Sequence, residues 1–145
     1  MISKFKILLI LIILLFVWSC GNKEKKISEI VEVDMEMQMS NAYKQGYLEL
    51  QGGDVLLAAK KFNEAELLYP QSSWAPKSVL MAAYAYYSEN YYYDSIYELK
   101  RYLGTYPKHE DTAYAHFLLG MSFYEQIVDE KKDLKSILNA KKQFE

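Results

Sequence analysis

The 145-residue chain has little of the chemistry that enzymes and metal sites need, with only one cysteine and two histidines. A lone cysteine, Cys20, cannot form an internal disulfide, so packing must hold the folded part together. His109 and His116 have no HExxH motif and no second cysteine beside them, which argues against a metal site. The chain also has no GxSxG motif and no glycine-rich phosphate loop. The sequence therefore predicts a protein that is not an enzyme and has no cofactor or metal.

An excess of positive charge is also missing. The formal net charge is −2, and residues 1–19 contribute two lysines and no acidic residue, so the remainder is more negative still. A nucleic-acid-binding domain usually carries a basic patch that neutralises phosphates. The charge balance therefore predicts no nucleic-acid partner.

The sequence has one long apolar run, at residues 7–18, and it is too short to span a membrane comfortably. Lys4 and Lys6 precede the run and Ser19 follows it, as in a secretory signal peptide covering residues 1–19. Residues 17–20 resemble a bacterial lipobox, although Trp18 is larger than usual. That resemblance implies that Cys20 carries a covalent lipid such as palmitate, and Gly21 favours the outer membrane. The alternative is an uncleaved signal anchor.

Residues 20–39 are interpreted as a lipidated N-terminus and an extended linker. From residue 31 to residue 39, apolar and polar residues alternate, which is the period of an extended segment. No second strand is available to pair with it. The segment is therefore expected either as an arm along the first helices or as a disordered linker.

A fixed period organises the rest of the chain. The small residues Gly46, Ala83 and Gly120 recur every 37 residues, and the Tyr-Pro pair at residues 69–70 recurs at residues 106–107. Such a period is typical of stacked repeats rather than a single closed core. Between residues 74 and 107, apolar residues with helical spacing predict two antiparallel helices around a polar turn.

These features resemble the tetratricopeptide repeat (TPR). The resemblance implies an all-α solenoid of about two and a half helical hairpins, at residues 40–70, 74–107 and 110–145, with the last incomplete. Ser40 or Asn41 is expected to cap the first helix. The spacing from Gly120 to Ala140 in the third unit is eight residues longer than that from Gly46 to Ala58 in the first, which indicates an insertion, expected at residues 127–133. His116 falls at a core position and is expected to be packed. The chain is expected to lack C-terminal repeats.

In TPR arrays the first helices of the hairpins line a groove. The family's groove positions correspond to apolar or aromatic residues here, so one interpretation is a groove that binds a hydrophobic peptide. Tyrosine suits such a groove, because its ring gives a large contact area at a low cost in conformational entropy. Packing between repeats is the alternative, and it is favoured for Tyr43. Leu50 also occupies a groove position. The candidate binding residues are Tyr47, Leu80, Tyr84, Tyr87, Phe117, Met121 and Tyr124.

Several runs together resemble the alphaproteobacterial members of the BamD (ComL) family of outer-membrane protein assembly lipoproteins. They include residues 69–75, 81–87, 100–103 and 113–123. The resemblance implies a scaffold on the periplasmic face of the outer membrane, anchored through Cys20. Its implied partners are a BamA-like β-barrel insertase, other Bam lipoproteins and the C-terminal segments of unfolded outer-membrane proteins. Two alternatives remain open: another periplasmic TPR lipoprotein scaffold of the cell envelope, and an enzyme subunit that uses the repeats as an adaptor.

Overall fold

The computed structural model describes residues 30–127 and 133–145. Six helices and no strand occur in these ranges, and no helix there is long and apolar enough to cross a membrane. The predicted signal peptide, Cys20 and residues 21–29 lie outside the described part. The helices are α2 (Ile30–Gly52), α3 (Val55–Leu68), α4 (Trp74–Ser88), α5 (Tyr92–Thr105), α6 (Thr112–Tyr124) and α7 (Leu134–Phe144).

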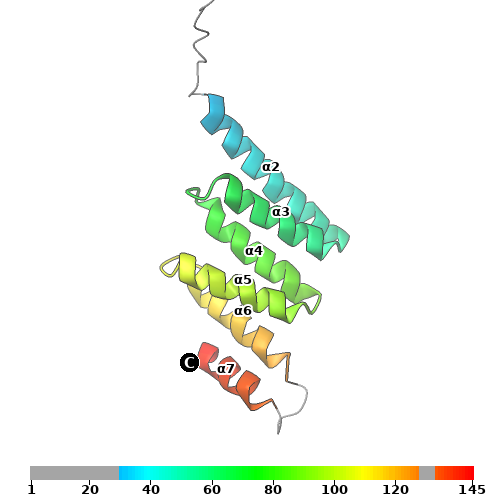
Figure 1. Cartoon of the computed structure of the whole chain (residues 1–145), viewed down its shortest axis with the longest axis vertical. Coiled ribbons are helices and arrows are strands. Elements are labelled where there is room, and N and C mark those ends of the chain that lie inside the picture. Colours follow the sequence, from blue (N-terminus) through cyan, green and yellow to red (C-terminus); the bar gives the residue numbers. More distant parts are fainter. Residues whose placement is uncertain (1–29, 128–132) are drawn as a thin grey trace, which may run out of the picture.

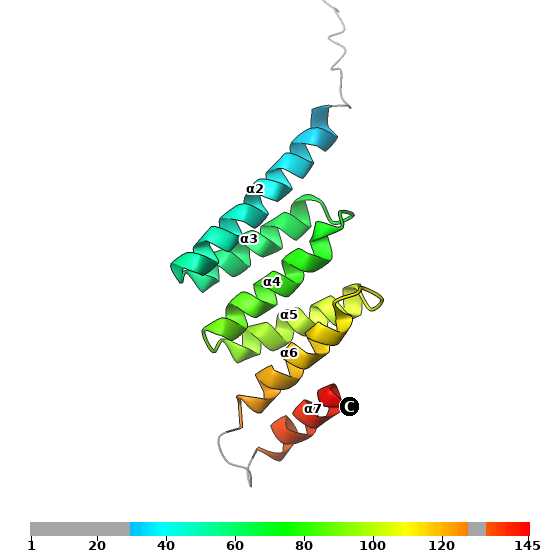
Figure 2. The ribbon, with the colours of Figure 1, turned by 180° about the vertical axis from the view of Figure 1, so that it is seen from behind.

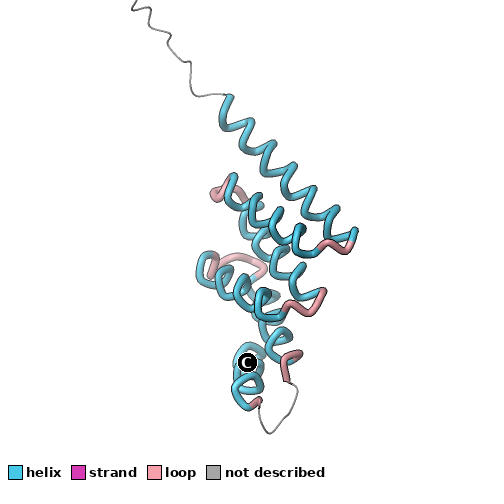
Figure 3. Tube along the Cα trace, turned by 45° about the vertical axis from the view of Figure 1, so that its right-hand side comes forward, coloured by secondary structure: helices cyan, strands magenta, loops and turns pink. Residues whose placement is uncertain are grey.

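The helices form a stack in chain order, running from α2 at one end to α7 at the other (Figures 1 and 2). In the described part, each helix packs extensively against the next one in sequence, and the contact between α4 and α6 is small. The side view in Figure 3 shows the same succession of hairpins. We call α2–α3 unit one, α4–α5 unit two and α6–α7 unit three. The predicted TPR-like all-α repeat fold is confirmed.

The residues that recur every 37 positions lie where the two helices of a unit cross. A Cβ atom placed on Gly46 would come within 2.9 Å of the Phe62 ring, and one on Gly120 within 2.5 Å of the Phe144 ring. In unit two, Ala83 and Leu99 are both fully buried in one cluster. Each crossing therefore pairs a small residue with a large one, and this allows the backbones to approach closely.

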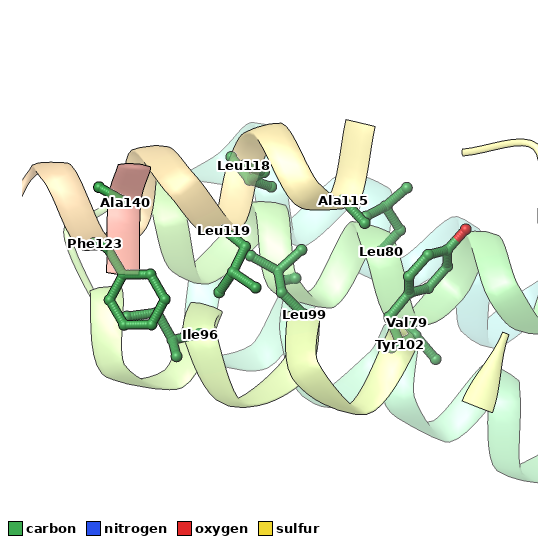
Figure 4. Packing of buried hydrophobic residues seen from close by; sticks show 11 residues of the cluster. Val79, Leu80, Ile96, Leu99, Tyr102, Ala115, Leu118, Leu119, Phe123 and Ala140 are labelled. Atoms are coloured by element: carbon green, nitrogen blue, oxygen red, sulfur yellow. The ribbon is translucent and has the colours of Figure 1, made fainter. Parts of the chain in front are cut away.

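The hydrophobic core is a series of clusters rather than one centre. The largest joins α4, α5, α6 and α7, with Leu99 and Tyr102 fully buried in it (Figure 4). A second cluster packs Phe62 of α3 against the alanines of α4, and a third joins Met39 and Ala42 of α2 to Ala65 of α3. Each unit thus buries its apolar face against its neighbours, as in other solenoids.

The turns between helices use the residues expected of them. Asp54 caps α3, because its Oδ1 accepts a hydrogen bond of 3.0 Å from the backbone N–H of Leu57. Gly53 before it has a φ of +85°, which is easy for glycine. Pro76 lies in the first turn of α4, where proline is tolerated because the backbone N–H it lacks would have no partner within the helix.

The extended conformation expected up to residue 39 is wrong over residues 30–39, which form the first turns of α2. Met35, Met39 and Ala42 have helical spacing, and Met39 and Ala42 are buried against α3. Met35 and Met39 belong both to the alternating pattern of an extended segment and to the spacing of a helix, so the sequence is compatible with either conformation. The packing of Met39 and Ala42 against Ala65 favours the helix. Ser40 and Asn41 therefore lie inside α2, and neither caps it.

In unit three, the predicted insertion at residues 127–133 falls in the connection between α6, which ends at Tyr124, and α7; residues 128–132 lie outside the described part. His116 is not a packed core residue. It is exposed on α6, and its Nδ1 lies 2.8 Å from Oε1 of Gln143 on α7.

A polar cluster ties α3 to α5. Arg101 donates hydrogen bonds to Glu66 (2.6 Å) on α3, to Asn63 Oδ1 (2.9 Å) on α3, and to Glu98 (2.9 Å) on α5. The Tyr106 hydroxyl donates a further bond of 2.9 Å to Glu66. Both glutamates are buried, and charge-assisted bonds of this kind offset the cost of burying them. We call these five residues the inter-unit tie.

The tie shifts the pKa of two of its members. Burial, reinforced by the hydrogen bond to Glu66, raises the pKa of Tyr106 to about 12, since a phenolate would face the carboxylate. Partial burial by itself would lower the pKa of Arg101, but its hydrogen bonds to Glu66 and Glu98 outweigh this and raise the pKa. Arg101 therefore stays charged throughout the physiological pH range.

Replacing Gly46 with alanine tests the close crossing in unit one. The added Cβ would overlap the fully buried Phe62 ring, so Gly46→Ala should lower the free energy of unfolding by about 1–3 kcal/mol despite the better helix propensity. Gly104→Ala is the matched control, because no atom lies within 4 Å of its Cβ position, and it should stabilise α5 by about 0.5 kcal/mol. Urea unfolding followed by circular dichroism measures both. Equal effects of the two substitutions would rule out a steric role for Gly46.

The raised pKa of Tyr106 predicts a specific alkaline instability. The unfolded chain loses this proton near pH 10 and the folded chain near pH 12, so the hydroxyl's stabilising contribution is complete below pH 10 and declines as the pH rises to 12. Tyr106→Phe should cost about 1 kcal/mol at neutral pH, from the lost bond to Glu66. The difference from the original protein should shrink above pH 10 in urea titrations. A difference that stays constant would contradict the shift.

Candidate functional site

The first helices of the three units present aromatic side chains beside their core stripes. On α4, Val79 and Ala83 are buried, while Tyr84 on the adjacent face is 40% exposed. On α2, Tyr47 follows Tyr43 by one helical turn and is 48% exposed. Helical spacing alone therefore places one set of side chains in the core and the next set at the surface.

A hollow of about 360 Å³ lies where α2, α4 and α6 come together. Leu80 forms its floor and is only 7% exposed. Burial raises the pKa of Tyr114, and the phenols of Tyr84 and Tyr87 raise it further. The residues that line this hollow are Tyr43, Lys77, Leu80, Met81, Tyr84, Asp111 and Tyr114.

A second hollow, of about 540 Å³, lies along α2 and shares Tyr43 with the first. The Tyr43 ring meets Trp74 edge-on at 5.0 Å and Phe62 at 5.2 Å, so it is held in place as the ridge between the two hollows. The lining is mostly apolar, with a few charged groups. Its residues are Glu36, Met39, Ser40, Tyr43, Lys44, Tyr47, Leu48 and Trp74.

A third hollow of about 420 Å³ includes both Tyr47 and Tyr84, so it connects α2 with α4 on the same surface. We call the surface formed by these three hollows the aromatic groove. Its rings combine apolar area with hydroxyl tips, and Lys77 lies over the Trp74 ring at 5.9 Å. Such a surface can contact bulky apolar groups through its rings and donate hydrogen bonds through its hydroxyl tips.

The structure distributes the predicted binding residues over more than one place. Tyr47, Leu80 and Tyr84 line the aromatic groove. Tyr87 packs at the edge of the core and against Tyr92 of α5, with ring centroids 5.8 Å apart. Met121 is partly buried on α6.

The other two predicted residues lie toward α7. Phe117 is 53% exposed and faces Phe144 at 6.2 Å. Tyr124 lines a separate hollow, together with Ile137 and Phe144 of α7. The predicted set therefore spans more than one surface, and only Tyr47, Leu80 and Tyr84 belong to the aromatic groove.

Sequence reasoning missed several groove residues. Trp74 and Lys77 begin α4, and Tyr114 and Asp111 belong to the start of α6. The TPR groove positions begin one turn later in each helix, so they do not include these residues. A useful signal was available, because aromatic residues at both helix starts follow the recurring Tyr-Pro pairs.

The loop before α6 contains the cluster His109, Glu110 and Asp111, whose ligand atoms lie within 4.8 Å of one another. The Nδ1 atom of His109 is already engaged. It lies 2.9 Å from the Tyr102 hydroxyl and accepts a bond of 3.3 Å from the backbone N–H of Asp111. His109 therefore orders this loop and fixes the start of α6.

Comparison with known proteins gives one consistent answer. The family model YfiO, described as an outer membrane lipoprotein, matches residues 35–145. Outer membrane protein assembly factor BamD of Caulobacter vibrioides is 33% identical over 114 residues, which cover 79% of this chain and 36% of that protein. BamD of Rickettsia prowazekii is 27% identical over 125 residues, which cover 86% of this chain and 48% of that protein. The chain therefore spans between about a third and a half of these relatives.

Proposed function

The chain belongs to the YfiO family of outer membrane lipoproteins, and from this premise we propose that it is a scaffold of the β-barrel assembly machinery. In this proposal Cys20 carries the lipid that anchors it to the periplasmic face of the outer membrane. It binds unfolded outer-membrane protein precursors and works with a BamA-like insertase and other Bam lipoproteins. Relatives named as outer membrane protein assembly factors support this role.

The aromatic groove is the observation that carries the proposal. Two of its hollows, those of about 540 and 360 Å³, share the Tyr43 ring, so each can take one bulky side chain of the same extended segment. Burying an aromatic or large aliphatic side chain contributes roughly 1.5–3 kcal/mol, which is about 10- to 100-fold in affinity for each hollow. We therefore assign the C-terminal segments of precursors, which end in an aromatic residue, to this groove.

The rings of the groove should bind peptide without being essential to the fold. Tyr47 and Tyr84 are 48% and 40% exposed, so their replacement by alanine should cost less than about 1 kcal/mol in stability. Each replacement should weaken a labelled precursor peptide ending in phenylalanine by about tenfold in fluorescence anisotropy. Tyr93→Ala and Tyr97→Ala are matched controls on α5, with exposed fractions of 81% and 68%, and should not change the affinity.

Three outcomes would count against this site. The first is equal binding by all four variants. The second is binding of a peptide whose terminal aromatic residue is replaced by serine as tightly as the original. The third is unfolding of the Tyr84→Ala protein in circular dichroism, which would make the ring part of the packing between units.

The proposed assembly role predicts a partner in detergent extracts. The lipidated protein should co-purify with a BamA-like β-barrel, and Cys20→Ser should leave it in the soluble periplasmic fraction without incorporated palmitate. The two or three acyl chains expected on a lipidated cysteine should hold the protein firmly at the membrane, whereas a single chain binds membranes only marginally. If the extract contains the lipidated protein but no such barrel, a different cell-envelope scaffold is the better interpretation.

A further inference from the structure

The aromatic groove is shared among helices that are not packed firmly on one another. Its lining comes from α2, α4 and α6, whereas extensive backbone packing in the described part joins α2 to α3, α3 to α4, and so on along the chain. The width of the groove is therefore set indirectly, by the angle between neighbouring units. Whatever fixes unit one against unit two also fixes the distance between Tyr43 and Tyr84.

The inter-unit tie is placed to fix that angle. Arg101 of unit two reaches Glu66 and Asn63 of unit one, which are 35 and 38 residues away in sequence and so about one repeat apart. Asn63 returns a bond of 3.0 Å to Glu98, so bonds run in both directions between α3 and α5. The guanidinium makes a planar fork that holds several acceptors in one geometry, which a lysine cannot reproduce.

The tie also reaches the rim of the groove through packed rings. Tyr106 lies beside Tyr102 with ring centroids 5.8 Å apart, and the Tyr102 hydroxyl lies 2.9 Å from His109 Nδ1. His109 in turn holds the backbone of Asp111, which lines the groove. A continuous series of contacts thus links Glu66 on one side of the stack to the groove on the other.

We propose that Arg101 is a positioning residue for the aromatic groove, which it shapes by holding units one and two at a fixed angle without touching the peptide. The proposal rests on the proposed peptide-binding function. It assigns the tie a role in affinity, beyond its contribution to stability. The charged fork is suited to this role because its bonds have defined directions, whereas apolar contacts between the same helices would tolerate sliding.

The test combines peptide affinity with a distance measurement. Arg101→Met keeps the length of the side chain and removes all of its hydrogen bonds, and Arg101→Lys keeps only the charge. The Arg101→Met protein should bind the phenylalanine-ending peptide at least fivefold more weakly, and the Arg101→Lys protein about twofold more weakly. Spin labels on Lys60 of α3 and Tyr97 of α5, both exposed, should show a wider distance distribution in the Arg101→Met protein.

Ile96→Val is the control for a loss of stability alone, because it removes a buried methyl group from α5 and leaves the tie intact. It should change neither the affinity nor the distance distribution. If the Arg101→Met protein does not fold, Asn63→Ala is the milder variant, since it removes only the bonds to Arg101 and Glu98. An unchanged affinity or an unchanged distribution in the folded tie variants overturns the proposal.

The two proposals fail in different ways. If the original protein binds no peptide, the proposed function fails. The spin-label distances in the Arg101→Met protein then still decide whether the tie sets the angle between the units. A distance distribution as narrow as that of the original protein would show that the tie does not set the angle between the units, and the second proposal would fail as well.

Discussion

The close approach of two helices at a residue without a bulky side chain is the constraint on which the rest of the structure depends. Gly46 faces the ring of Phe62, Ala83 is buried with Leu99, and Gly120 faces Phe144. Because the same crossing recurs in each hairpin, the units have similar shapes and can stack in a row. The stack then leaves the first helices free to present side chains on a shared surface.

That surface and the inter-unit tie have complementary chemistry. The groove gathers tyrosine rings around apolar floors such as Leu80, while the tie gathers buried charges on α3 and α5. Apolar contact in the groove accepts many side chains of suitable size, and directional bonds in the tie allow one arrangement of the helices. The peptide-binding role proposed for the groove needs both properties, because breadth of binding is useful only on a surface of defined shape.

The sequence predicted the parts of the fold that depend on local spacing. The period at Gly46, Ala83 and Gly120 predicted the positions at which the helices of each unit cross. The start of α2 could not be predicted in the same way, because residues 30–39 fit two periods and only contact with Ala65 separates them. The tie and much of the groove depend on residues a whole repeat apart, such as Glu66 and Arg101, and spacing does not reveal which side chains meet.

The unequal lengths of α2 and α3 have a geometric consequence. With 23 residues against 14, α2 continues past its partner, and at 1.5 Å per residue the difference amounts to roughly 13 Å of continuous helix. A helix transmits torsion as well as distance, since each residue turns it by about 100°. Inserting or deleting one residue in this overhang would therefore rotate the groove by about 100° about the α2 axis, relative to whatever is joined at the N-terminal end of the helix. The same change would move the groove along that axis by only about 1.5 Å.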